Sequence, residues 1–254
     1  MALSVARLTR DPSVTGLCTD FDGTLAAIVP DPGDARPIDG AVELLGRLAA
    51  RFARVAVVSG RPVSFLLDHL GSRSAVTLVG LYGMEWSERG AVVEHPDAGQ
   101  WRATVAAAAD AAEAAAPDGV TIERKGLSVT VHVRSAPEHQ PWVRSWAEAE
   151  AARTGLLVRP ARMSVELQPP VAVDKGVVVE RLLAGLDAAC FMGDDVGDLP
   201  AFDALDRLEA AGVGVVRVAV TSTEAPPALL ERADLVVDGP EGALGLLGQL
   251  AAGG

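Results

Sequence analysis

The chain has few cysteines and few histidines, and both shortages restrict its chemistry. Only Cys18 and Cys190 could form a disulfide, and both lie in apolar stretches typical of buried strands. We expect free, buried thiols in a reducing compartment, because cysteine is often fully buried and cytosolic disulfides are rare. The four histidines show no spacing that pairs one with a serine or cysteine nucleophile. A hydrolase that uses such a nucleophile is therefore disfavoured.

Positive charge and long apolar runs are also scarce. The formal net charge is -12 and the sequence pI is about 4.7, so the surface repels nucleic-acid phosphates and we expect no nucleic-acid partner. No apolar run approaches the roughly 20 residues that span a bilayer. Residues 1–12 lack the apolar core of a secretion signal. We therefore predict a cytoplasmic protein without membrane contact, in which any phosphate site is made locally positive.

Apolar segments alternate between strand and helix patterns in the first and last thirds of the chain. The hydrophobic content of 49% is enough for a sizeable core. This alternation predicts an α/β fold with a parallel sheet covered on both faces. The expected strands are 17–19, 54–58, 76–79, 188–192, 213–220 and 235–237, and the expected helices are 41–52, 62–70, 177–186, 198–208 and 240–250.

The middle of the chain has a different pattern. An alanine-rich segment, 101–116, predicts a helix, and residues 128–133 alternate polar and apolar as in an antiparallel strand with one wet face. A further helix is expected at 138–153, with strands at 156–158 and 163–167. We therefore predict two domains, a core made of residues 1–86 and 168–254 and an inserted α+β domain at 87–167.

Polar segments follow four apolar stretches of the predicted core. Ligands of open α/β sheets bind at the carboxyl ends of strands, so these segments should converge. The first is Asp20-Phe21-Asp22-Gly23-Thr24, directly after a strand. One carboxylate can attack phosphorus while the other handles protons. A lone Asp-x-Asp is typical of surface turns, but the preceding strand and the Gly-Thr favour a phosphate site.

The other three segments supply a hydroxyl, an ammonium group and further carboxylates. Ser59 could donate to a phosphoryl oxygen or equally cap a helix. Lys175 stands at the head of an apolar helix, where a cation opposes the helix dipole, so a role at a phosphoryl group explains it better. Asp194 and Asp198 belong to an acidic Gly-Asp loop whose carboxylates need a cation, and hard oxygen ligands suit Mg²⁺. Asp198 also suits the N-cap of the next helix.

The order of these segments resembles the four motifs of the haloacid-dehalogenase-type phosphatases over essentially the whole chain. The resemblance implies a Rossmann-like core with an inserted cap domain between the second and third motifs. It implies a nucleophile, Asp20, and an acid–base group, Asp22. Ser59 and Lys175 would hold the phosphoryl oxygens. The resemblance further implies Mg²⁺ held by Asp20, Asp22, Asp194 and Asp198.

Longer stretches look like the trehalose-6-phosphate phosphatase family. They are 58–62, 80–85, 123–128 with His132 and Arg134, 165–167 and 174–176. By this resemblance the substrate is trehalose 6-phosphate, and trehalose-6-phosphate synthase is a candidate partner. The implied substrate-binding residues are Thr24, Arg61, Lys125, Glu166, Arg124 and His132.

Three departures from the family pattern keep other functions open. Tyr82 stands where the family usually has His, Gln168 where an Arg often occurs, and Gly197 where a Thr is usual. They motivate another sugar or pseudo-disaccharide phosphate as substrate. A non-catalytic sugar-phosphate sensor is disfavoured, because a pure binder needs no paired nucleophile and acid. Metal-dependent phosphate release would separate the enzyme from the sensor.

Overall fold

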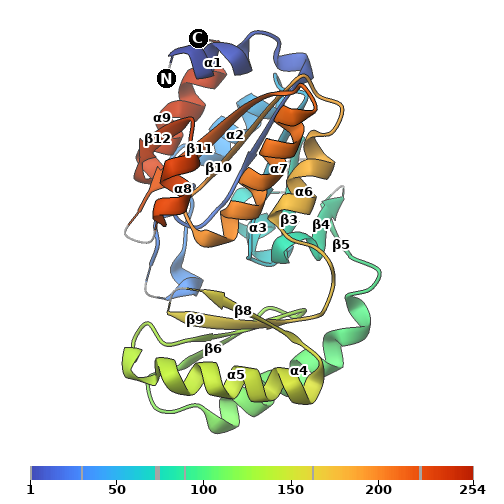
Figure 1. Ribbon diagram of the computed structural model, residues 1–254, viewed down its shortest axis with the longest axis vertical. Helices are drawn as coiled ribbons and strands as arrows, with labels where there is room; N and C mark the ends of the chain where they lie inside the picture. Colours follow the sequence, from blue (N-terminus) through green and yellow to red (C-terminus); the bar gives the residue numbers. More distant parts are fainter. Residues whose placement is uncertain are drawn as a thin grey trace. The chain divides into compact units, whose positions relative to one another are not determined.

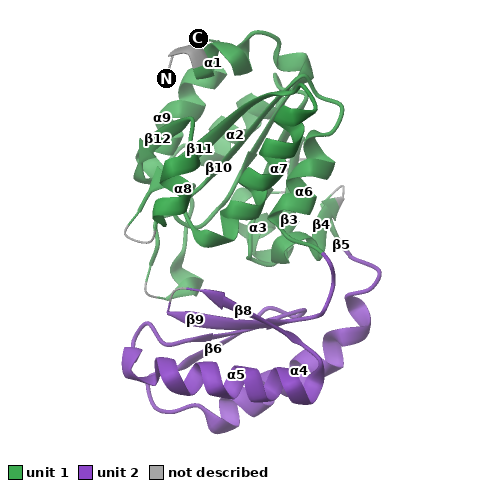
Figure 2. Cartoon of the chain, viewed as in Figure 1, with its two compact units in different colours: residues 1–93, 173–254 green, residues 94–172 purple. Residues whose placement is uncertain are grey.

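The computed structural model describes residues 2–29, 31–71, 75–88, 90–161, 163–222 and 225–253. These residues form two compact units (Figure 2). Unit 1 comprises residues 1–93 and 173–254, and unit 2 comprises residues 94–172. Unit 2 is thus inserted into the chain of unit 1.

Unit 1 is built on one sheet with the strand order β12-β11-β10-β1-β2-β3-β4-β5 among the described residues (Figure 1). Strands β10, β1 and β2 are neighbours and run parallel. Only the edge beyond β3 turns antiparallel, at β4. The strands are β1 (Thr15–Thr19), β2 (Arg54–Val58), β3 (Val76–Gly80), β4 (Glu85–Glu88), β5 (Ala91–Glu94), β10 (Ala188–Gly193), β11 (Gly214–Thr221) and β12 (Leu235–Asp238).

Helices cover both faces of this sheet, as predicted (Figure 1). One face packs against α1 (Ala2–Thr9), α2 (Ala41–Ala49), α3 (Val63–Leu70) and α9 (Gly239–Ala252). The other face packs against α6 (Lys175–Leu183), α7 (Leu199–Ala210) and α8 (Pro227–Arg232). The apolar residues of β1 and β10 are buried because both faces are covered, which explains their continuous apolar runs.

Unit 2 is a four-stranded antiparallel sheet with two helices. The strand order is β6-β7-β9-β8, with β6 (Thr121–Arg124), β7 (Val129–His132), β8 (Leu157–Ala161) and β9 (Ser164–Gln168). Helices α4 (Arg102–Ala115) and α5 (Gln140–Thr154) share one apolar core with the sheet. Trp142 and Trp146 of α5 stack with ring centroids 6.0 Å apart. The sheet thus has one face in the core and one polar face.

Several elements were not predicted from the sequence. Helix α1, the β4–β5 pair and β6 all lie in segments for which no element was expected. Val5 and Leu8 of α1 are buried in the apolar core of unit 1. Since β4 and β6 contain charged residues and are short, their apolar periodicity is weak.

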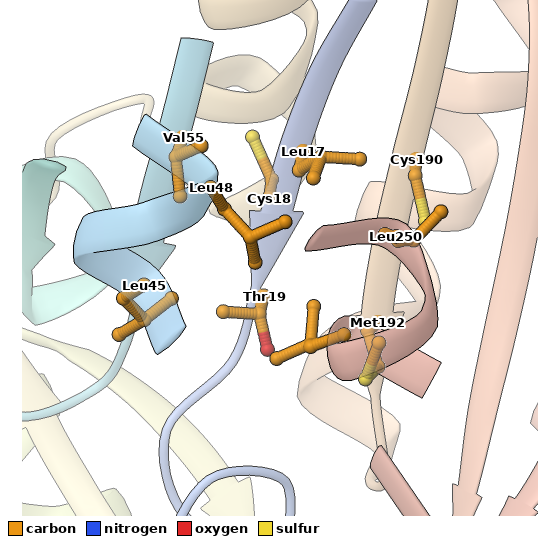
Figure 3. A pocket seen from close by; sticks show the side chains of 10 residues that line it. Leu17, Cys18, Thr19, Leu45, Leu48, Val55, Cys190, Met192 and Leu250 are labelled. Atoms are coloured by element: carbon orange, nitrogen blue, oxygen red, sulfur yellow. The ribbon is translucent and has the colours of Figure 1, made fainter. Parts of the chain in front are cut away.

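The two thiols are free and buried, which confirms the prediction. Cys18 and Cys190 lie on the adjacent strands β1 and β10 but belong to the apolar clusters on opposite faces of the sheet. Burial raises the pKa of Cys18 to about 12, so its thiol stays neutral. Figure 3 shows both residues lining an apolar pocket whose other walls include Leu45 and Leu48 of α2 and Leu250 of α9.

No helix among the described residues is both long and apolar enough to cross a membrane.

Candidate active site

Three polar side chains follow the neighbouring parallel strands β10, β1 and β2. Asp194 follows β10, Asp20 follows β1 and Ser59 follows β2. The amide of Asp20 still donates to the carbonyl of Met192 on β10, at 2.8 Å. The sheet therefore places these groups side by side at its carboxyl edge, where α/β proteins bind ligands.

Lys175 joins two of the predicted carboxylates. Its Nζ lies 2.7 Å from Oδ1 of Asp20 and 2.6 Å from Oδ1 of Asp198. All three side chains are buried. Asp174 caps α6 by accepting the amide of Val177 at 2.9 Å, which fixes where the helix starts and hence where Lys175 stands. The ammonium group is thus a fixed bridge between the first and fourth predicted segments.

Asp198 uses both carboxylate oxygens inside the protein. Besides Lys175, it accepts the amides of Asp194 at 2.9 Å and Asp195 at 3.1 Å through Oδ2. Its side chain does not cap α7, although the residue stands at the N-cap position predicted for it. Asp198 therefore shapes the acidic loop and orients Lys175 rather than offering a free oxygen.

The carboxylates raise one another's pKa. Burial, opposed by Lys175 and reinforced by Asp198 and Asp194, raises the pKa of Asp20 well above its usual range. Burial and the charge of Asp198 also raise the pKa of Asp194 to about 8 and that of Asp195 to about 6. For Lys175, burial opposes the charge, but Asp198 and Asp20 more than offset it and its pKa lies well above normal. The cluster holds more negative charge than Lys175 neutralises.

A divalent cation fits this cluster. Ligand oxygens of Asp20, Asp194 and Asp198 lie within 4.8 Å of one another. Among the described residues, Oδ2 of Asp194 is buried without a hydrogen-bond partner, so it is free to coordinate. Gly23 has φ +73° and packs directly against the Asp194 carboxylate, where any Cβ would clash. Hard oxygen donors of this kind suit a hard divalent cation such as Mg²⁺.

Asp22 binds Arg61 through both of its carboxylate oxygens. Nε of Arg61 donates to Oδ2 of Asp22 at 2.8 Å, and Nη2 donates to Oδ1 at 2.7 Å. Nη1 donates to the carbonyl of Pro32 at 2.7 Å. The guanidinium predicted to bind substrate is therefore occupied by the predicted acid–base group and a backbone carbonyl.

Ser59 and Thr24 are both fully buried at this edge. Oγ of Ser59 accepts the amide of Arg61 at 3.1 Å, while Pro62, not Ser59, stands at the N-cap of α3. The helix-cap interpretation of Ser59 is therefore wrong, and its hydroxyl proton can still be donated. Oγ1 of Thr24 has no partner within the described part of the chain, so it too is available.

The predicted cap residues separate onto two faces of the unit 2 sheet. Glu123, Thr130, Glu166 and Arg159 are cross-strand partners in one row, so they share a face. Nζ of Lys125 lies 3.7 Å from both Glu123 and Glu166. We call this side of the sheet the polar face. Its residues are Glu123, Lys125, Ser128, Thr130, His132, Arg159, Glu166 and Gln168.

Arg124 does not belong to the polar face. It follows Glu123 directly, so it points to the helix side of the sheet, where Nε donates to Glu113 and Nη2 pairs with Asp110 of α4. Its placement among the sugar-contacting candidates is therefore corrected. His132 remains, because its Nε2 lies 2.8 Å from Glu123 on the polar face.

The family model described as trehalose-phosphatase matches residues 18–232. The chain belongs to the trehalose-phosphatase family. This family member is 35% identical over 208 residues to the trehalose-phosphate phosphatase of Mycolicibacterium paratuberculosis, covering 78% of this chain and 53% of that protein. It thus spans about half the length of that curated relative.

Solved structures agree with the fold of this trehalose-phosphatase family member. The C-terminal domain of the C. albicans trehalose-6-phosphate phosphatase has a TM-score of 0.81 at 24% identity, covering 99% of this chain and 96% of that chain. A haloacid dehalogenase-like hydrolase from Bacteroides thetaiotaomicron has a TM-score of 0.59 at 16% identity, covering 91% of this chain and 98% of that chain. The predicted fold class is confirmed.

Several residues of these sites were missed by the sequence analysis. In unit 1 they are Asp195, whose buried Oδ1 lacks a partner within the described residues, and Ser222, which hydrogen-bonds Asp194. In unit 2 they are Glu123, Ser128, Thr130 and Arg159. The period-two alternation of β6 and β9 would have placed Glu123 beside the predicted Lys125 and Glu166, had β6 been recognised.

Proposed function

We propose that this chain is a Mg²⁺-dependent phosphatase that hydrolyses trehalose 6-phosphate to trehalose and phosphate. One observation carries the proposal: buried Lys175 bridges Asp20 and Asp198, and Oδ2 of Asp194 in the same cluster has no hydrogen-bond partner among the described residues. Lys175 and a divalent cation held by these carboxylates would neutralise the phosphoryl oxygens, while the carboxylate of Asp20 attacks. Membership in the trehalose-phosphatase family supports the choice of substrate.

Asp20 is the proposed nucleophile. Its carboxylate attacks phosphorus, and the bond from phosphorus to the sugar oxygen breaks, leaving an aspartyl-phosphate. Asp22 protonates the departing oxygen. It then takes a proton from the water that attacks the same phosphorus and releases phosphate from Asp20. Ser59, Thr24 and Lys175 bind the phosphoryl oxygens during both steps.

Mg²⁺, when bound, supplies positive charge for the phosphoryl oxygens. Its proposed ligands are the carboxylates of Asp20 and Asp194 and the backbone carbonyl of Asp22. Asp198 contributes by orienting Lys175, as its two oxygens are engaged within the protein. Oδ2 of Asp194, which has no hydrogen-bond partner in the described part of the chain, supports this division of roles.

The inserted unit 2 is the proposed cap domain, and its polar face is the proposed sugar-recognition surface. Lys125, Glu166 and His132 offer charged donors and acceptors suited to hydroxyl groups. The cytoplasm is the proposed location. Trehalose-6-phosphate synthase is the proposed source of substrate and a candidate partner.

The decisive experiment measures phosphate release from a panel of sugar phosphates, with Mg²⁺ and with a chelator. We expect the highest kcat/KM with trehalose 6-phosphate, and loss of activity in chelator that added Mg²⁺ restores. Activity that persists unchanged in chelator would rule out the metal. Binding of the sugar phosphate without any release of phosphate would make the protein a sensor.

A second candidate is a phosphatase for another sugar or pseudo-disaccharide phosphate. Gln168 favours it, because this buried amide accepts from Nε of Arg159 at 3.1 Å on the polar face. The family often has an arginine at the position of Gln168. A neutral amide there removes one positive charge from the surface proposed to bind the sugar. The same panel distinguishes the two candidates by which phosphate is preferred.

A further inference from the structure

We propose that Arg61 is a positioning residue that holds Asp22 in the orientation needed for proton transfer, and not a ligand of the substrate phosphate. The inference rests on the role proposed above for Asp22. Both oxygens of Asp22 are bound by one guanidinium, at 2.7 and 2.8 Å. A two-point contact fixes the plane of a carboxylate as well as its distance, which a single hydrogen bond cannot do.

Arg61 is itself held from three directions. Its remaining terminal nitrogen, Nη1, donates to the carbonyl of Pro32 at 2.7 Å. The guanidinium carbon lies 4.7 Å from the ring centroid of Phe65 on α3. Phe65 in turn meets Phe21, the residue between the two site carboxylates, edge to face at 5.8 Å. The orientation of Asp22 is therefore tied to α3 and to the turn around Pro32.

The backbone of Arg61 is equally constrained. Its amide donates to Oγ of Ser59, and its carbonyl accepts the amide of Leu81. The side chain of Arg61 is only 10% exposed, whereas that of Asp22 is 36% exposed. The donor is thus enclosed while its acceptor is more exposed, as expected when a buried residue holds a more accessible reactive group in place.

The contact leaves Asp22 able to act. An ionised carboxylate has about four lone-pair positions, and the guanidinium uses two of them. One of the other two can carry the proton that Asp22 gives to the leaving oxygen, and the ionised carboxylate that results can then accept a proton from the attacking water. By contrast, Arg61 already donates from Nε, Nη1 and Nη2 within the protein, which leaves at most two of its five N–H donors for any other ligand.

Leaving groups of different basicity test the proposal. A sugar alkoxide needs a proton from Asp22, whereas para-nitrophenolate leaves without one. In Arg61→Ala, kcat/KM for the sugar phosphate should fall by about 100-fold, the size of a general-acid contribution. For para-nitrophenyl phosphate it should fall far less. The loss should lie in kcat more than in KM, since substrate contacts are kept.

Two further variants protect the test against a folding defect. Arg61→Lys keeps the charge but cannot make the two-point contact, so it should show the same selective loss. Arg153→Ala is a matched control, because Arg153 makes a similar two-point pair with Glu150 in unit 2. It should leave both substrates unaffected. Added methylguanidinium should partly restore Arg61→Ala, but not the double variant Arg61→Ala/Asp22→Asn.

The outcomes separate this inference from the proposed function. Equal losses on both substrates with a raised KM would make Arg61 a phosphate ligand and overturn the proposal. If Asp22→Asn slows the sugar phosphate but Arg61→Ala does not, the inference alone fails. If Asp22→Asn changes neither substrate, the acid–base role of Asp22 fails, and the inference fails with it. If the losses of kcat/KM in Arg61→Ala and Asp22→Asn simply add in the double variant Arg61→Ala/Asp22→Asn, Arg61 does not act through Asp22 and the inference fails.

Discussion

The chain contains two lysines, and one of them, Lys175, is buried among carboxylates. Its ammonium group lies 2.7 Å from an oxygen of Asp20 and 2.6 Å from an oxygen of Asp198, so the three groups form one charged cluster. Changing one member alters the charge seen by the others, because buried charges are weakly screened. Substitutions of Lys175, Asp20 or Asp198 should therefore affect the site more than substitutions elsewhere in it.

Replacing Asp20 by Asn should abolish turnover while the protein still folds. The amide is nearly the same size and still lies beside Lys175, but it cannot attack phosphorus as a carboxylate does. Phosphate release measures the effect, and thermal unfolding checks the fold. Asp187→Asn, at an exposed acidic position, is the control. Full activity in Asp20→Asn would contradict the nucleophile assignment.

Metal-free protein should lose stability as pH rises from about 4 to 8 through the contribution of Asp194. The pKa of Asp194 is raised from 3.8 to about 8 in the folded state, chiefly by burial. Between these values the folded protein holds the proton and the unfolded chain does not, so stability falls as pH increases. Thermal unfolding in chelator across this range measures the slope.

The matched variant for this pH effect is Asp194→Asn, which lacks the titrating group and should show a shallower slope. Mg²⁺ competes with the proton for the same carboxylate, so the stabilisation by Mg²⁺ should be larger at pH 8 than at pH 6. An equal Mg²⁺ effect at both pH values, or an unchanged slope in Asp194→Asn, would argue against Asp194 as a ligand.

At the scale of elements, the start of α6 controls where Lys175 lies. Asp174→Ala removes the hydrogen bond to the amide of Val177 and should cost about 1 kcal/mol of stability. It should also lower kcat, because Lys175 is the first residue of the helix. Chemical denaturation and phosphate release measure the two effects. Asp11→Ala is the control. It removes the exposed hydrogen bond from the amide of Ser13 to Asp11, which is distant in sequence from Lys175, and it should lower stability without lowering kcat.

Continuous apolar runs made most elements of unit 1 predictable. Strand 54–58 was predicted with its observed bounds, and 188–192 missed only Gly193 of β10. Short elements with charged residues were not predictable, because β4 and β6 lack such runs and take their place from pairing with β3 and β7. Helix α1 likewise depends on contacts with distant segments, which local periodicity does not report.

The candidate site was predictable where it follows strands. Asp20, Ser59 and Asp194 come directly after buried strands, so their proximity could be inferred from topology. The contact between Arg61 and Asp22 could not, because it depends on side-chain directions across a sequence separation of 39. The orientation of Arg124 could not be inferred either, since β6 was not recognised.

At the scale of the whole molecule, two units divide the proposed work, and substrate choice should belong to unit 2. Glu166→Gln should reduce kcat/KM for trehalose 6-phosphate by at least about tenfold, as expected for a lost charged hydrogen bond to substrate. It should spare para-nitrophenyl phosphate, which has no sugar. Arg153→Ala, on a helix of the same unit, is the control. Equal losses on both substrates would detach Glu166 from sugar recognition.

The insertion of unit 2 between the two halves of unit 1 also affects how the protein is made. Strand β1 pairs with β10, so Thr15 meets Ala188 across most of the chain. A nascent chain that ends before β10 has β2 on one side of β1 but lacks β10 on the other. It also lacks Asp194 and, until α6 is made, Lys175. During synthesis the N-terminal half must therefore wait with an unpaired strand edge, a condition that favours chaperone binding or aggregation. The residues proposed for the active site are complete only when synthesis has passed Asp198.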